Sequence, residues 1–163
     1  MRKQKPLETY EDVKEKALRL LEYRSHSQYE LRTKLIRAGA KEEHIDDVLE
    51  FCSNYGFTND EQFAKYKAHD LIKLKKYGLQ RVRAELSSKG ISDEIISNVL
   101  AEYENNDETD TLIELVAKKL KNDFSDKNKD KCIRYFIYRG YKLWDIKNAI
   151  NLYIERSELD NEI

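Results

Sequence analysis

The chain has 163 residues, of which 40% are hydrophobic and 37% are charged, and its formal net charge is −1. This composition is typical of a folded helical protein with a large exposed surface. No apolar run reaches the length of a membrane span, and the basic start at residues 1–6 lacks the apolar stretch of a signal peptide. The sequence therefore predicts a cytoplasmic protein, in which Cys52 and Cys132 are reduced core thiols.

The first predicted repeat spans residues 10–55 and follows a flexible tail at 1–9. Apolar residues at helical spacing predict a first helix over about 10–24. Ser27 and Glu30 have the spacing of a capping box, so a second helix is expected to start at Ser27. Gly39 ends it, and a third helix is expected over about 41–54.

The second predicted repeat spans residues 56–105 and copies the first. Thr58 and Glu61 again have capping-box spacing, which predicts a helix that starts at Thr58. Gly78 takes the place of Ser27 as the cap of the next helix, and Gly90 ends that helix. Ser92 is expected to cap the third helix of this repeat.

The third predicted repeat spans residues 106–156 and precedes a frayed tail at 157–163. Its first helix is followed by a polar loop at 121–127, after which Asn128 is expected to cap a second helix. Gly140 ends that helix, and an apolar stripe predicts a last helix.

Glycine recurs with a period near 50 residues, which unites these segments. The three equivalent positions are Gly39, Gly90 and Gly140, and an isoleucine follows each of them six residues later. A fixed period of this length indicates one supersecondary unit that is repeated. The sequence therefore predicts an all-α tandem array of three three-helix repeats, elongated and curved, with an extended binding surface instead of one buried active site.

Charge alternates in step with the repeat. Residues 1–40, 63–90 and 118–142 sum to +4, +6 and +6, whereas the three intervening segments sum to −6, −8 and −3. Basic residues interleaved with tyrosine suit contact with phosphates and some stacking on bases. The candidate binding residues are Arg24, Arg32, Lys34, Arg37, Lys73, Lys75, Lys76, Arg81, Arg83, Lys89, Arg134, Arg139 and Lys142. A solvated helix face is the alternative explanation of such runs.

No catalytic or metal-binding motif is present in the sequence. The chain has neither a phosphate-binding loop of the Walker type nor a glycine-rich dinucleotide motif. His26, His44 and His69 are scattered and are interpreted as exposed or half-exposed polar residues. We therefore expect neither an enzyme nor a bound metal or cofactor.

Four blocks of sequence resemble the RecX family of regulatory proteins, and together they cover about residues 10–155. They are the block over 17–35, the block from Thr58 to Ala64, the block from Lys76 to Ile91 and the triplet Arg139-Gly140-Tyr141. The third repeat departs most from the pattern, because Lys131 and Cys132 replace a pair of the Glu–Leu type.

The resemblance implies a helical tandem repeat without catalysis of its own. It implies that the chain, as a monomer, binds the RecA filament on single-stranded DNA, lies in its groove and restrains ATP hydrolysis, strand exchange and SOS activity. Two alternatives stay open at this point: a stand-alone DNA-binding protein that uses one repeat as a helix-turn-helix, and a helical adaptor that binds protein alone.

Overall fold

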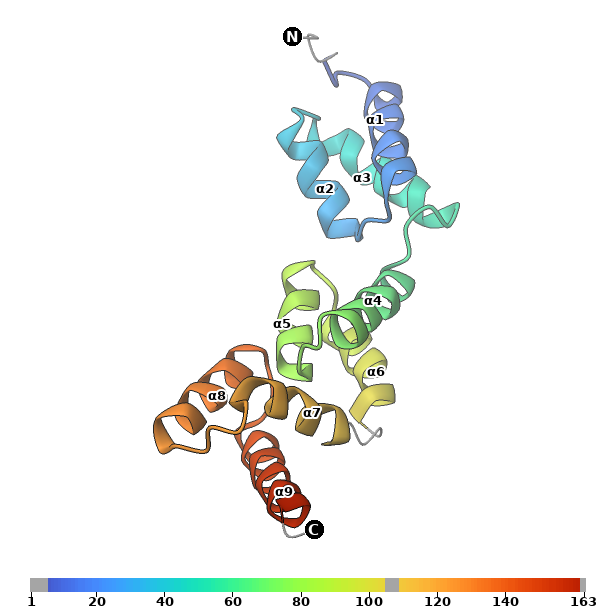
Figure 1. The fold of residues 1–163 in the computed structure, drawn as a ribbon. Helices are drawn as coiled ribbons and strands as arrows, with labels where there is room; N and C mark the ends of the chain where they lie inside the picture. The colour runs from blue at the N-terminus through green and yellow to red at the C-terminus, as the bar shows by residue number, and fades with distance from the viewer. Residues whose placement is uncertain (1–5, 105–108, 162–163) are drawn as a thin grey trace. The chain divides into compact units, whose positions relative to one another are not determined.

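The computed structural model describes residues 6–104 and 109–161, and within these ranges every regular element is helical (Figure 1). The first three helices are α1 (Tyr10–Tyr23), α2 (Gln28–Arg37) and α3 (Glu42–Asn54). The next are α4 (Asp60–His69), which a π-helical turn at Asp70–Leu74 extends, α5 (Leu79–Ser88) and α6 (Asp93–Glu104). The last are α7 (Thr109–Leu120), α8 (Asp126–Tyr138) and α9 (Leu143–Asn161). The predicted all-α fold with its three-helix repeats is confirmed.

The chain divides into two compact units whose boundary passes through the middle repeat. The first unit combines the chain up to Lys67 with Leu86–Val99, and the second combines Ala68–Glu85 with the chain from Leu100 onward. Helices α4, α5 and α6 therefore supply residues to both units. Each unit contains one terminal repeat and part of the middle repeat, as expected where a repeat must pack on its neighbours to bury enough surface.

The core of the first unit follows from the apolar stripes of α1, α2 and α3. Each helix has apolar residues three or four positions apart, which places them on one face. The buried residues are Leu7, Val13, Ala17, Leu31, Leu35, Ile45, Val48, Leu49 and Cys52. Leu7 belongs to the segment for which the sequence predicts a tail, yet its side chain is buried against the three helices.

The core of the second unit has the same origin in α7, α8 and α9. Its buried residues are Leu112, Ile113, Val116, Leu120, Cys132, Phe136, Ile146, Ala149 and Ile150. Helix α9 continues to Asn161, so residues 157–161 are helical where the sequence predicts a frayed tail. The predicted boundary at 105/106 and the tail residues 1–5 and 162–163 lie outside the described residues.

Three predicted helix caps differ from those in the structure. Ser27 caps α2 by accepting a hydrogen bond from the Glu30 amide at 3.1 Å, but the Glu30 carboxylate binds Arg24 and Lys89 instead of completing a capping box. Asn59, not Thr58, caps α4, since its side chain accepts a hydrogen bond from the Gln62 amide at 2.9 Å.

The third difference concerns α8, which begins at Asp126 after an N-cap at Ser125, so the polar loop is shorter than the predicted 121–127. Asn128 lies inside the first turn of the helix. Its side-chain amide donates to the carbonyls of Leu120 and Asp123 at 3.1 and 2.9 Å. Asn128 thus ties the loop to the helix rather than capping it.

Candidate nucleic-acid interface

Two sequence blocks that lie 60 residues apart meet in the second unit, and we call this contact the second junction. It joins the start of α5 to the end of α8. The Gly78 amide donates to the Arg139 carbonyl at 2.8 Å, and the Gln80 amide donates to the Gly140 carbonyl at 3.2 Å. The Tyr141 hydroxyl donates to the Lys76 carbonyl at 3.1 Å. The backbone of Lys76 itself is left-handed, with a φ of 54°.

Only glycine fits at the centre of the second junction. A Cβ atom added to Gly78 would lie 2.3 Å from the Gly140 carbonyl oxygen, and one added to Gly140 would lie 2.3 Å from the Arg81 amide nitrogen. Separations below 3.0 Å force the backbone to move, because neither neighbour is the end of a flexible side chain. The two glycines therefore let two backbones approach closely enough for direct hydrogen bonds.

Cations and aromatic rings alternate along the surface of this junction. The Arg81 guanidinium lies 4.8 Å from the Tyr138 ring centre and 5.1 Å from that of Tyr77. The Arg139 guanidinium lies 4.9 Å from Tyr77 and 5.5 Å from Tyr135. Each contact of this type stabilises an exposed site by about 0.5–1 kcal/mol. The row therefore holds α5 against α8 and leaves the Tyr135 and Tyr138 side chains exposed.

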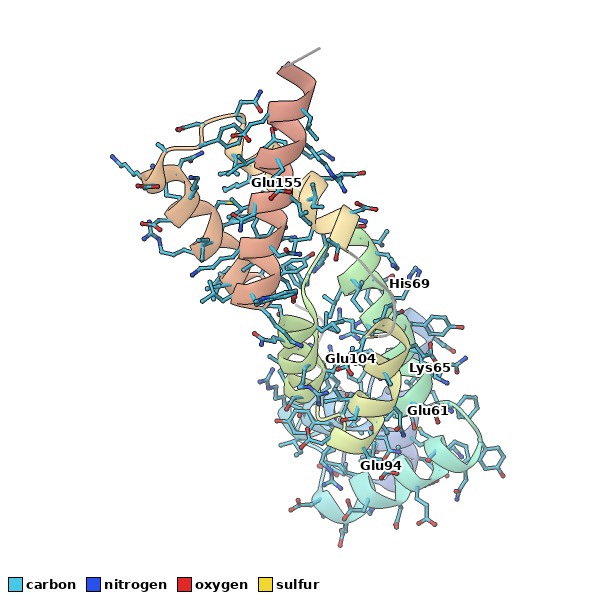
Figure 2. All side chains as sticks on the ribbon, turned by 90° about the horizontal axis from the view of Figure 1, so that it is seen from below. Glu61, Lys65, His69, Glu94, Glu104 and Glu155 are labelled. Carbon is cyan, nitrogen blue, oxygen red and sulfur yellow. The ribbon has the colours of Figure 1, made fainter. Side chains whose placement is uncertain are left out.

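A cleft of about 530 Å³ opens beside the second junction, within the second unit. Its walls come from the first turns of α5, α7 and α9 and from the end of α6, where Glu104 lies (Figure 2). The lining residues are Tyr77, Gly78, Leu79, Gln80, Tyr103, Glu104, Thr109, Leu112, Gly140, Tyr141, Lys142, Trp144, Asp145 and Asn148. Three helices begin at these walls, and helix N-termini carry partial positive charge.

The first unit contains an equivalent contact, the first junction, between the start of α2 and the end of α5. The Ser27 hydroxyl donates to the Lys89 carbonyl at 2.6 Å, and a Cβ atom on Gly90 would lie 2.3 Å from that of Tyr29. Ser27 and Gly78 are equivalent positions in the repeat, as are Gly90 and Gly140. Both junctions therefore join the start of a second helix to the glycine end of the second helix in the next repeat.

An ionic cluster replaces the aromatic row in the first junction. Glu30, whose side chain is 11% exposed, lies 3.0 Å from Arg24 and 2.9 Å from Lys89. Burial alone raises the pKa of Glu30, but the hydrogen bonds from Arg24 and Lys89 outweigh burial and lower its pKa from 4.5 to about 2. The carboxylate is therefore charged at neutral pH and holds both cations in place.

The three histidines are placed differently from one another. His26 is buried in the first junction, contrary to the prediction, with Nδ1 2.9 Å from the Arg24 carbonyl and no partner for Nε2. Burial lowers the pKa of His26, which favours the neutral ring. His44 is half-buried. His69 is exposed on the face of α4 that carries Glu61 and Lys65, an ion pair at 2.8 Å (Figure 2).

The structure divides the predicted binding residues into two groups. The side chains of Arg24, Arg81, Lys89 and Arg139 make contacts within the junctions, and Arg32 pairs with Asp46 of α3. The other residues are exposed or half-exposed: Lys34, Arg37, Lys73, Lys75, Lys76, Arg83, Arg134 and Lys142. They are spread over both units. The first group combines structural and surface roles, whereas the second includes cations whose side chains face solvent.

Several residues of this region escaped the sequence analysis. Tyr135 lies at one end of the aromatic row, and Tyr103 and Trp144 line the cleft. A signal for the junctions exists in the sequence, because Ser27 precedes Lys89 by 62 residues and Gly78 precedes Arg139 by 61. Nothing in the spacing of Tyr103 and Trp144 indicates that they share a cleft.

No helix among the described residues is long and apolar enough to cross a membrane. Within 6–104 and 109–161, no group of three histidine, cysteine or acidic side chains could hold a metal ion. Both cysteines are buried and carry free thiols.

Models of the RecX family match two segments of the chain. The first three-helix domain of RecX matches residues 14–52, and the second matches residues 59–100. Regulatory protein RecX of Vibrio vulnificus (strain CMCP6) is 33% identical over 140 residues, which covers 85% of this chain and 90% of that protein. The chain belongs to the RecX family. The resemblance that the four sequence blocks indicated is thereby confirmed.

Other members of the RecX family agree in sequence and in fold. Regulatory protein RecX of Clostridium perfringens (strain 13 / Type A) is 34% identical over 142 residues, covering 84% of this chain and 66% of that protein. The crystal structure of RecX from Lactobacillus salivarius matches with a TM-score of 0.78 at 20% identity. It covers 88% of this chain and 96% of that one, so the two share the helical repeat fold.

Proposed function

We propose that this RecX-family chain binds a RecA filament on single-stranded DNA, in the groove of the filament, and restrains its ATP hydrolysis and strand exchange without catalysis of its own. Membership of the RecX family carries the proposal. The second junction, which includes the family block from Lys76 to Ile91, supports it by presenting the Arg81 guanidinium beside the exposed Tyr138 ring. Lysine, arginine and tyrosine in this arrangement suit a partner that carries phosphates and acidic side chains.

Electrostatic contact is tested best with cations that hold no junction together. Reversal of Arg81, which donates to the Tyr138 carbonyl, or of Lys89, which binds Glu30, would loosen a junction as well as remove a surface charge. Arg37, Arg134 and Lys142 have exposed side chains, so their reversal to glutamate should leave folding nearly unchanged.

The experiment measures the ATPase rate of RecA on single-stranded DNA against the concentration of this protein. We expect wild type to lower the rate stoichiometrically, and the triple reversal of Arg37, Arg134 and Lys142 to require a much higher concentration. Lost attraction and new repulsion at charges that meet a partner together cost several kcal/mol. A control protein with Lys41, Lys118 and Lys147 reversed has the same net charge and exposed positions outside the candidate set. It should inhibit like wild type.

Two results would contradict the proposal. Absence of any effect of wild type on RecA would reject the function. Equal inhibition by wild type and the triple reversal would reject these cations as the contact. Titration with random single strands and duplexes at several salt concentrations separates the alternatives: a strong preference for one duplex sequence favours a stand-alone DNA-binding protein, and no salt-sensitive affinity favours a protein-only adaptor.

A further inference from the structure

The cleft of the second unit contains an aromatic side chain that the fold does not use. Trp144 lines the cleft near the start of α9, and its side chain is 73% exposed. Ile146, Ala149 and Ile150 of the same helix fill the core, so the helix is anchored without the indole. Among the described residues, no ring contact or cation contact involves Trp144. A large flat apolar surface in a concave site is a feature of ligand-binding sites.

The other aromatic rings of the cleft have partners already. Tyr77 lies between Arg81 and Arg139, and the Tyr141 hydroxyl is bonded to the Lys76 carbonyl. Tyr103 has the Lys73 ammonium 5.9 Å from its ring centre. Trp144 is therefore the aromatic side chain of the cleft whose ring face is available to a ligand. The cleft volume of about 530 Å³ lies within the roughly 300–1,000 Å³ of sites for small molecules.

Four cations lie in the cleft or over its aromatic rings, against two acidic lining residues. Lys142 lines it, Lys73 lies over Tyr103, and Lys75 and Arg139 lie over Tyr77. The acidic lining residues are Glu104 and Asp145, and Asp145 lies in the first turn of α9, where the helix dipole compensates its charge. A ligand that suits both the indole and the cations has a flat aromatic group joined to a negative group.

We propose that this cleft binds one unpaired nucleotide of single-stranded DNA, with the base stacked on the Trp144 indole and a phosphate beside Lys142. An unpaired base exposes its ring face, whereas the bases of a duplex are stacked on one another, so the site selects single strands. An aromatic side chain of a protein partner would satisfy the indole but not the cations. The inference rests on the proposed function, because it takes single-stranded DNA as part of the partner, and it adds a stacking site to the phosphate contacts.

Intrinsic fluorescence reports on this site directly, because Trp144 is the single tryptophan of the chain. An oligothymidylate of about 15 nucleotides, close to the site sizes of single-strand binding domains, is titrated into the whole protein. A strand of the same length without bases serves as the comparison. We expect saturable quenching by oligothymidylate and none by the abasic strand, since both carry the same phosphates and only one can stack.

Two variants separate stacking from phosphate contact. Trp144→Leu keeps an apolar side chain and should weaken binding of a labelled oligothymidylate roughly 5- to 150-fold, as loss of one base–aromatic stack does. The affinity of this variant for oligothymidylate should depend on salt in the same way as that of wild type. Lys142→Gln should instead reduce the slope of log affinity against log salt by about 0.7, the value for one contact to a single strand. Tyr23→Leu is the control, because Tyr23 is 88% exposed on α1, in the other unit. It should bind like wild type.

Three outcomes would overturn the nucleotide site: unchanged affinity of Trp144→Leu with wild-type helicity, equal quenching by the abasic strand, or quenching by a RecA filament without quenching by the oligonucleotide. The last would assign the cleft to a protein side chain. If oligothymidylate quenches the Trp144 fluorescence but this protein leaves the RecA ATPase rate unchanged, the nucleotide site is supported and the proposed function is rejected. If this protein lowers the RecA ATPase rate but the oligonucleotide does not quench the Trp144 fluorescence, the proposed function is supported and the nucleotide site is rejected.

Discussion

Alanine substitutions at three glycines should separate backbone strain from close packing. Gly39 has a φ of +85°, and a Cβ atom there would meet nothing within 4 Å. Gly78 lies outside the left-handed region, but a Cβ atom there would lie 2.3 Å from the Gly140 carbonyl oxygen. Gly140 combines a φ of +93° with a Cβ position 2.3 Å from the Arg81 amide nitrogen. Each variant therefore tests a different part of the same argument.

The expected losses of stability follow from these geometries. Gly39→Ala should cost about 1 kcal/mol, the strain of a left-handed residue with a Cβ atom. Gly78→Ala must open the second junction and weaken two backbone hydrogen bonds, each worth about 0.5–1.5 kcal/mol, so it should cost about 1–3 kcal/mol. Gly140→Ala adds the strain to the same loss and should cost about 2–4 kcal/mol.

Urea unfolding followed by two probes measures these losses. Far-ultraviolet circular dichroism reports on all helices, whereas Trp144 fluorescence reports on the second unit, which contains Gly78 and Gly140. Gly39→Ala should leave the fluorescence midpoint unchanged, since Gly39 belongs to the first unit. A Gly78→Ala protein as stable as wild type would refute the close-packing argument. Equal losses for Gly39→Ala and Gly140→Ala would refute the claim that contact adds to strain.

Two further predictions concern ionisable groups. The pKa of Glu30 is about 2 in the folded protein against 4.5 for the free group, so its stabilisation is complete above pH 4.5 and is lost as the pH falls toward 2. Glu30→Gln should flatten the pH dependence of stability in that window, and equal acid profiles of the two proteins would contradict this. Burial raises the pKa of Cys132 to about 11 despite the nearby Lys119. Cys132 should thus react with a thiol reagent at pH 8 far more slowly in the native protein than in urea; equal rates would contradict its burial.

The sequence predicts the repeats well because the signals of a helix are local. Apolar spacing and terminal glycines depend on neighbours within one or two turns, and the helices begin and end close to the expected residues. Caps were harder to predict where two polar residues compete. Thr58 and Asn59 are both good caps, and only the packing that buries Thr58 decides between them. The prediction that Asn128 caps α8 is wrong, because the sequence alone does not reveal that its side chain contacts the preceding loop.

The candidate site was less predictable, because its contacts join different repeats. Charge alone marks Arg81 and Arg139 as binding residues, but one of the two tyrosines that flank each of them comes from a segment about 60 residues away. Lys89 likewise meets Glu30 across a similar separation. The cleft that Trp144 lines has walls from four helices, and no local sequence pattern encodes such an arrangement.

The second junction depends largely on backbone atoms, and this has a consequence for how such proteins diverge. Two amide–carbonyl hydrogen bonds and two glycines fix the register of α5 on α8, and none of them needs a particular side chain. The residues around these backbone contacts can therefore change while the repeats keep their spacing. We expect such a scaffold to keep its fold when most of its residues differ, and RecX from Lactobacillus salivarius shares the fold at 20% identity. The surface is free to adapt to a new partner while the scaffold beneath it stays the same.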